Sequence, residues 1–165
     1  FDKVEGVISV ISGYSGGHLK NPTYADVVYT DSGHVEAVEI TYNPKVLSYK
    51  KLLDVFWRNI DPFDANGQFC DKGKSYRSVV FFSNKKQKDM INTSIKKLEK
   101  NFNKKIVTLV WKFDKFYKAE SFHQNYYENN FIRYLMYKKG CQREETLKKY
   151  GIKKNINHHY IYFIF

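Results

Sequence analysis

Cysteine and proline are scarce in this chain, and long apolar runs are missing. The 165 residues include 2 cysteines and 3 prolines. Cys70 and Cys141 lie far apart and form no C-x-x-C pair, which argues against a metal site of the zinc type. Because so few cysteines, with no disulfide framework, suit a reducing compartment, we expect the chain to act in the cytoplasm. The apolar runs are too short to span a bilayer, so we expect no membrane partner.

Arginine is also scarce, although the chain carries a formal net charge of +11 at pH 7. It occurs only as Arg58, Arg77, Arg133 and Arg143, whereas lysines are spread along the whole sequence. A nucleic-acid platform usually combines arginine with interleaved aromatic side chains. We therefore expect a solvated basic surface and no nucleic-acid partner. A basic nucleic-acid-binding domain is the alternative from a different functional class.

The rest of the composition describes one globular domain. Hydrophobic residues make up 42% of the chain and aromatic residues 18%, which suffices for a core. The sequence shows no repeat and no linker. Four of its 9 glycines fall within residues 13–33, which predicts a long ordered loop, and such loops inside compact domains are usually functional.

Hydrophobic periodicity predicts strands and helices on both sides of that loop. We expect strands over residues 7–12, 34–42, 77–82 and 106–111. Three helices are expected to begin with the N-caps Ser48, Asn84 and Ser121, the last two forming capping boxes with Gln87 and Gln124. A last helix is expected over residues 144–150, ended by Gly151. The predicted order of the first six elements is therefore strand, strand, helix, strand, helix, strand.

Three segments stand out because their residue types occur together. The first is Gly13–His18, which runs into Asn21-Pro22-Thr23-Tyr24. The second is Gly33–Val38, and the third is Gly67–Gly73, which runs into Ser75–Ser78. Together they resemble the A-type peptide methionine sulfoxide reductases, which reduce the S epimer of methionine sulfoxide.

The resemblance covers residues 1–151 and implies a fold. Adding the family's first strand and helix in front of Phe1 gives the order strand-helix-strand-strand-helix-strand. This implies an α/β (α+β) two-layer sandwich, with a ferredoxin-like mixed sheet and helices on one face. In this chain the first strand and helix are expected to be largely missing, so the reductase domain is incomplete. Residues 152–165 are expected to be an unrelated C-terminal tail.

The resemblance also implies a catalytic acid. Sulfoxide reduction needs a proton donor for the oxygen and hydrogen-bond donors where its charge develops. Glu36 is the implied acid, because a partly buried carboxyl near a strand start keeps its proton near neutral pH. Tyr24 and Tyr76 are the implied donors to the oxygen. The alternative for Glu36 is a surface carboxylate like that of Glu39.

Other residues of the motifs have less specific roles. Asp71 matches the aspartate that orders the tyrosines and a water in the family, although an Asx turn before Gly73 would also explain it. His34 is expected next to the pocket. A histidine in such a place, or in that of His123, is more often a structural hydrogen-bonding residue than a catalyst.

The sequence lacks the family's nucleophile. That cysteine belongs to a Gly-Cys-Phe-Trp segment, which does not occur in the 165 residues. Cys70 is expected next to the pocket, as a small semi-buried side chain. Cys141 matches the position of a possible resolving thiol, reduced in turn by thioredoxin. The implied function is reduction of methionine sulfoxide, free or in proteins, without a cofactor; a catalytically dead remnant is the alternative.

Overall fold

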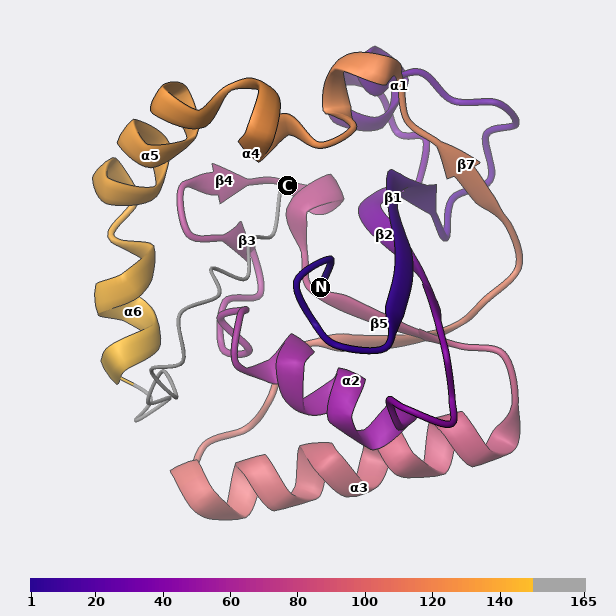
Figure 1. Cartoon of the computed structure of the whole chain (residues 1–165), viewed down its shortest axis with the longest axis vertical. Helices are drawn as coiled ribbons and strands as arrows, with labels where there is room; N and C mark the ends of the chain where they lie inside the picture. The colour runs from indigo at the N-terminus through magenta and orange to yellow at the C-terminus, as the bar shows by residue number, and fades with distance from the viewer. Residues whose placement is uncertain (150–165) are drawn as a thin grey trace.

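The computed structural model describes residues 1–149, in which strands pack against helices in two layers (Figure 1). The predicted tail over 152–165 and the expected end at Gly151 lie outside the described residues. The longest strand, β1 (Val7–Ser15), pairs antiparallel with β2 (Val35–Tyr42) on one side and with β7 (Phe116–Lys118) on the other. The pairing places Tyr14 opposite Glu36.

A second sheet consists of β5 (Val79–Phe82) and β6 (Leu109–Lys112), which run parallel. The helix α3 (Lys85–Phe102) connects them, as a parallel crossover requires. Within residues 1–149, β2 pairs only with β1, and β5 pairs only with β6. The two sheets therefore remain separate, and each presents an unpaired edge.

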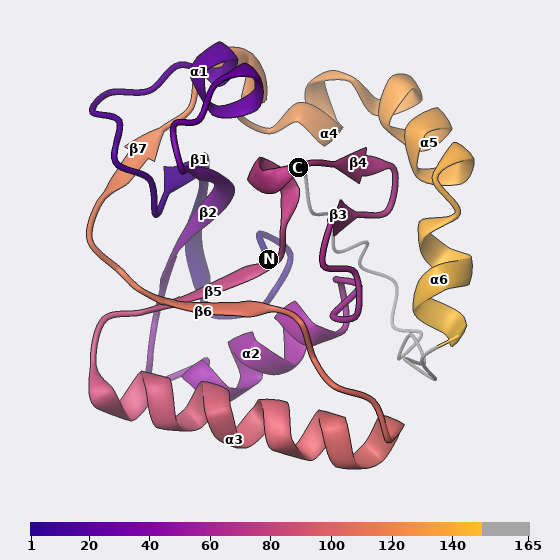
Figure 2. The same cartoon turned by 180° about the vertical axis from the view of Figure 1, so that it is seen from behind.

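The helix α2 (Tyr49–Trp57) joins the two sheets from below in the view of Figure 1. Its buried Leu53 and Trp57 pack with Ile91 of α3 and Val80 of β5. Its opposite flank packs against the β1–β2 sheet through Leu52 and Val55, in a second core cluster that includes Phe1. Each fully buried aliphatic side chain contributes roughly 1.5–3 kcal/mol to stability. The helices α2 and α3 thus form the layer that covers both sheets (Figure 2).

A long connection between β1 and β2 contains the short helix α1 (Tyr24–Tyr29). Its start is held by a capping box, in which Thr23 and Asp26 exchange side-chain and backbone hydrogen bonds. The loop before it approaches β2 very closely. A Cβ atom on Gly17 would lie 2.3 Å from the backbone nitrogen of His34, so only glycine fits there.

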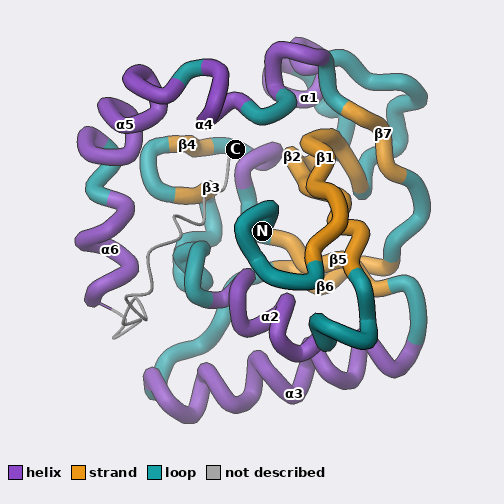
Figure 3. Tube along the Cα trace, in the orientation of Figure 1, coloured by secondary structure: helices purple, strands orange, loops and turns teal. Residues whose placement is uncertain are grey.

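Among the remaining elements, α4, α5 and α6 form an outer arc, and β3 and β4 lie between this arc and the two sheets (Figure 3). The chain forms a small hairpin of β3 and β4, a 3-10 turn η1, a second 3-10 turn η2, and three helices. Their bounds are Gly67–Gln68 for β3, Asp71–Lys72 for β4, Lys74–Tyr76 for η1, Ser121–His123 for η2, Tyr126–Asn129 for α4, Phe131–Gly140 for α5 and Arg143–Lys149 for α6.

The expected two-layer α/β class is confirmed, and the four predicted strands correspond to β1, β2, β5 and β6. The predicted capping box of Ser121 and Gln124 is wrong. Gln124 instead accepts from the backbone N–H of Ser12 at 3.0 Å and donates to its carbonyl at 2.9 Å, so it ties η2 to β1. Sequence alone cannot distinguish a local cap from such a distant backbone partner. No helix among residues 1–149 is long and apolar enough to cross a membrane.

Candidate active site

Two tyrosines from separate segments meet at one point. Tyr24 is the first residue of α1, and its backbone N–H donates to Glu120 Oε1 at 2.8 Å. Tyr76 ends η1, just before β5. Their hydroxyl oxygens lie 3.4 Å apart. Burial, the hydrogen bond with Tyr24 and the nearby Glu36 charge raise the pKa of Tyr76, so its phenol stays protonated at neutral pH.

Glu36 is the second residue of β2, and it lies within electrostatic reach of Tyr76. It lines a cavity of about 340 Å³ between β2, α2 and β5. The cavity is lined mainly by apolar side chains, among them Val38, Phe56 and Phe81. Burial, with a smaller contribution from the Asp71 charge, raises the pKa of Glu36 to about 7. The carboxyl therefore still holds a proton near neutral pH.

Asp71 lies in the β3–β4 hairpin, close enough to Glu36 and Tyr76 for its charge to raise the pKa of both. Burial raises its pKa, although a hydrogen bond from Tyr137 opposes that shift. The Tyr137 hydroxyl donates to Asp71 Oδ2. Tyr137 belongs to α5, a helix that the sequence analysis did not predict. The structure thus brings Tyr24, Glu36, Asp71 and Tyr76 to one region, and adds a tyrosine that no motif indicated.

A further carboxylate of the site, Glu120, was not predicted from the sequence. The Tyr14 hydroxyl donates to Glu120 Oε2 at 2.7 Å, and Tyr14 is only 2% exposed. Burial favours the protonated form of Glu120, but hydrogen bonds from Tyr24 and Tyr14 outweigh it, so the pKa of Glu120 lies below its ordinary value. Glu120 is therefore an ionised anchor that fixes the start of α1. Tyr14 and Tyr24 both donate to Glu120 only because the fold brings distant segments together, and the spacing of these residues in the sequence does not reveal this.

The two histidines of the motifs have different surroundings. His34 is buried, with Nδ1 accepting from the Gly17 N–H at 3.1 Å and Nε2 lying 2.8 Å from the Leu19 carbonyl. It therefore holds the glycine-rich loop on β2. The His123 ring packs 4.7 Å from the Tyr24 ring, and its Nε2 has no hydrogen-bond partner among the described residues. Burial lowers the pKa of His123.

Comparison with known proteins identifies the family. A model of the family described as "Peptide methionine sulfoxide reductase" matches residues 1–155. The peptide methionine sulfoxide reductase MsrA of Bacillus subtilis (strain 168) is 46% identical over 145 residues, which are 87% of this chain and 82% of that protein. The chain belongs to the peptide methionine sulfoxide reductase family. MsrA 2 of Staphylococcus aureus (strain MRSA252) is 40% identical over 157 residues, which are 94% and 89% of the two chains.

Solved structures of reductases share the fold. The reduced form of Mxr1 from Saccharomyces cerevisiae matches with a TM-score of 0.72 and 29% identity, covering 76% of this chain and 73% of that one. Methionine sulfoxide reductase A of Corynebacterium diphtheriae matches with a TM-score of 0.66 and 26% identity, covering 76% and 65% of the two chains. The two-layer architecture of this reductase is therefore that of MsrA proteins.

The cysteines of this reductase differ from the sequence-based expectation. Cys70 and Cys141 form a disulfide, so the expectation that neither takes part in one is wrong. In this form Cys141 is not a free resolving thiol, and no cysteine of the described chain is free. Cys70 is exposed, not semi-buried as expected. Pairing across 71 residues depends on how α5 folds back onto the hairpin, which sequence spacing does not reveal. The expected lack of disulfides therefore no longer supports a cytoplasmic location, which stays a prediction.

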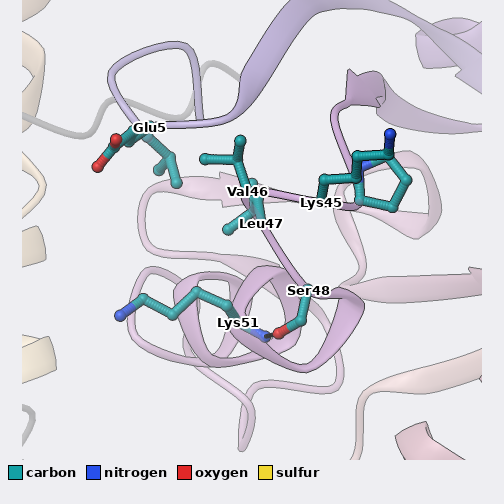
Figure 4. Close-up of a pocket in the computed structure, with 8 residues that line it drawn as sticks. Glu5, Lys45, Val46, Leu47, Ser48 and Lys51 are labelled. Atoms are coloured by element: carbon teal, nitrogen blue, oxygen red, sulfur yellow. Dashed lines mark hydrogen bonds between the residues drawn. The ribbon is translucent and has the colours of Figure 1, made fainter.

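A second cavity, of about 420 Å³, lies away from these residues (Figure 4). Glu5, Val46 and Lys51 are among the residues that line it, and none of the predicted site residues does. Glu36 lines the cavity of about 340 Å³, whereas Tyr24, Asp71 and Tyr76 line neither of these two cavities. Within residues 1–149, no group of three or more His, Cys, Asp or Glu side chains could hold a metal ion.

Proposed function

We propose that this domain reduces the S epimer of methionine sulfoxide, free or in proteins, with Glu36 as the acid. The observation that carries the proposal is the partly buried Glu36 carboxyl within electrostatic reach of Tyr76, with a pKa that burial and the Asp71 charge raise to about 7. A carboxyl that keeps its proton near neutral pH suits a substrate oxygen that becomes more basic as its bond to sulfur breaks.

The tyrosines serve as donors to that oxygen. A phenol donates a hydrogen bond without carrying charge, which suits an oxygen that gains negative charge in the transition state. The raised pKa of Tyr76 keeps its proton in place. With hydroxyl oxygens 3.4 Å apart, Tyr24 and Tyr76 are close enough to donate to one substrate atom. Asp71 acts as a positioning residue beside them.

The reaction also needs a thiolate, since neither a phenol nor a carboxylate is a soft nucleophile for sulfur. The thiolate attacks the sulfoxide sulfur to form an S–S bond, and Glu36 supplies a proton to the oxygen. The oxygen then passes to the cysteine sulfur as a hydroxyl group: a new S–O bond forms on the cysteine, while the substrate's S–O bond and the S–S bond both break. The products are methionine and a cysteine sulfenic acid. Two thiols then return the sulfenic acid to the thiol, forming a disulfide between them and one molecule of water. We infer that thioredoxin supplies these thiols in the cytoplasm.

The cavity at Glu36 is where a strand carrying the nucleophile would fit. The unpaired edges of β2 and β5 lie on either side of it, and its apolar lining includes Ala37, Ile40 and Val79. An extended segment between two open edges could pair with both and join the sheets into one. A Gly-Cys-Phe-Trp run at the end of such a segment would lie beside Glu36, near the start of β2.

The test compares this chain with a version that carries the family's first strand and Gly-Cys-Phe-Trp segment in front of Phe1. Reduction of a methyl sulfoxide is followed with dithiothreitol as the thiol source. The extended protein should turn over the S epimer and leave the R epimer unchanged, and the 165 residues alone should be inactive. Changing the added cysteine to serine should abolish turnover.

Two outcomes would contradict the proposal. An extended protein that folds but reduces neither epimer would favour the catalytically dead remnant. Turnover by the 165 residues alone, lost in Cys70→Ser, would instead identify Cys70 as the nucleophile. Attack distance is demanding, and Cys70 does not line the cavity at Glu36, so we expect that Cys70 does not replace the nucleophile.

A further inference from the structure

The β3–β4 hairpin is joined to the C-terminal segment by neighbouring residues next to the candidate site. Cys70 is bonded to Cys141, which follows α5 directly. The next residue, Asp71, accepts a hydrogen bond from Tyr137, one turn earlier in α5. A covalent bond and a hydrogen bond therefore connect the same two segments side by side.

The segment that follows Cys141 has a second anchor. Arg143 is 5% exposed, donates from Nη2 to the Asn59 carbonyl at 2.8 Å, and its guanidinium lies 5.0 Å from the Phe69 ring centre. A buried guanidinium with such contacts holds its position without the disulfide. The start of α6 thus stays fixed when the cysteines are separated.

The helix α5 lacks such an anchor. Tyr134 is its only buried residue, whereas Ile132 is 74% exposed and Met136 is 71% exposed. A helix of 10 residues with this little buried apolar surface gains little stability from packing. Its position over the hairpin is supported by the disulfide, by Tyr134, by the Tyr137 contact and by an ion pair of 2.6 Å between Lys138 and Glu144 of α6.

The disulfide is within reach of a reductant. Cys70 is exposed and Cys141 is partly exposed, so a thiolate has access to the bond. Accessible disulfides exchange with dithiols, and in a reducing compartment such bonds are usually transient. A dithiol would donate two electrons and two protons, break the S–S bond to give two thiols, and itself become a disulfide.

We propose that the Cys70–Cys141 disulfide is a reversible redox clamp, and that Tyr137 is the positioning residue which the clamp holds against Asp71. The proposal rests on the proposed function, since it assigns Asp71 to the reductase site. In the oxidised form Asp71 is fixed by Tyr137 beside Glu36 and Tyr76. Reduction loosens α5, withdraws the Tyr137 hydroxyl and leaves Asp71 free to turn.

The Asp71 charge gives this movement a consequence. It contributes to the raised pKa of Glu36 and to that of Tyr76. A displaced Asp71 would therefore change the electrostatic surroundings of the acid without any change in the acid itself. The redox state of two cysteines outside the reaction would set how well the site is assembled.

The test uses the whole 165-residue chain, oxidised and then reduced with dithiothreitol, at neutral pH. Carboxyl ¹³C NMR follows Asp71, and amide hydrogen exchange follows α5, with α3 as the internal reference. Reduction should shift the Asp71 signal and speed exchange in α5 by at least about tenfold relative to α3, since a loosened helix opens more often. The same measurements on Cys70→Ser should give the reduced pattern without dithiothreitol.

Tyr137→Phe with the disulfide intact isolates the hydroxyl. It should shift the Asp71 signal like reduction does, and reduction of this variant should shift that signal no further, because both changes remove one contact. Tyr29→Phe, which alters a 78% exposed tyrosine, is the matched control and should leave Asp71 unchanged.

An Asp71 signal that is insensitive to reduction, or to Tyr137→Phe, would overturn the proposal, even if α5 loosens. None of these readings involves turnover. Failure of the clamp would leave the reductase assignment intact, and an inactive extended protein would leave the clamp intact.

Discussion

The hydroxyl oxygens of Tyr24 and Tyr76 lie 3.4 Å apart, although the residues are 52 positions apart in the sequence. One comes from the start of α1 and the other from the end of η1. Two hydroxyl donors this close, one of them within electrostatic reach of the partly buried Glu36 carboxyl, create a place where a single oxygen can be held and protonated. This relationship defines the candidate site more directly than any single residue does.

Loss of either hydroxyl should slow turnover in the extended reductase. Tyr24→Phe or Tyr76→Phe removes one donor while keeping the ring, and a single donor to a developing charge is worth about 10²–10³ in kcat. Steady-state kinetics with a methyl sulfoxide measure the effect. Tyr29→Phe serves as the control, and equal losses in all three variants would show that the pair has no special role.

Glu36 should lower the free energy of unfolding at alkaline pH. Its pKa is raised in the folded state, so the folded protein binds more protons than the unfolded chain between roughly the ordinary glutamate value and 7. Stability contributed by this group is therefore lost as pH rises through that window. Glu36→Gln should raise the free energy of unfolding at pH 8 by about 1–3 kcal/mol, measured by urea denaturation.

The matched control for that experiment is Glu39→Gln, which alters an exposed glutamate of the same strand. It should change stability little at any pH, and the Glu36→Gln gain should shrink as pH falls and vanish below the ordinary pKa of a glutamate, near about pH 4. A Glu36→Gln variant that is less stable at pH 8 than at pH 5, relative to the parent protein, would reverse the sign and remove the argument for a buried acid.

The unpaired edges of β2 and β5 should make the 165-residue chain associate. Open edges present free N–H and C=O groups to other chains. We expect concentration-dependent oligomers in sedimentation velocity, and less association once the extended version supplies a strand. A monodisperse monomer with one cooperative unfolding transition would count against an incomplete sheet.

Local sequence patterns predicted much of this fold. Ser48 and Asn84 cap α2 and α3 as expected, because capping depends on residues three positions apart. The capping box predicted for Gln124 was wrong for the opposite reason, because its side-chain amide is hydrogen-bonded to the backbone of Ser12, 112 positions away. β7 was also missed, because its three residues carry too short a pattern to distinguish from a loop.

The candidate site shows the same division. Tyr24, Glu36, Asp71 and Tyr76 were named from motifs, and the structure places the first three within electrostatic reach of Tyr76. Tyr137 and the cysteine pairing could not be named, since both depend on how α5 folds back onto the hairpin. A helix held by few buried residues leaves little trace in hydrophobic periodicity.

The pKa of Glu36 in the folded chain tests the central claim most directly. Carboxyl ¹³C NMR can follow Glu36 from pH 4 to pH 9, with its signal assigned by Glu36→Gln and with exposed Glu39 as the internal reference. The account predicts a midpoint near 7 for Glu36, clearly above the ordinary value of a glutamate. A midpoint at or below the ordinary value of a glutamate would contradict the assignment of Glu36 as the acid.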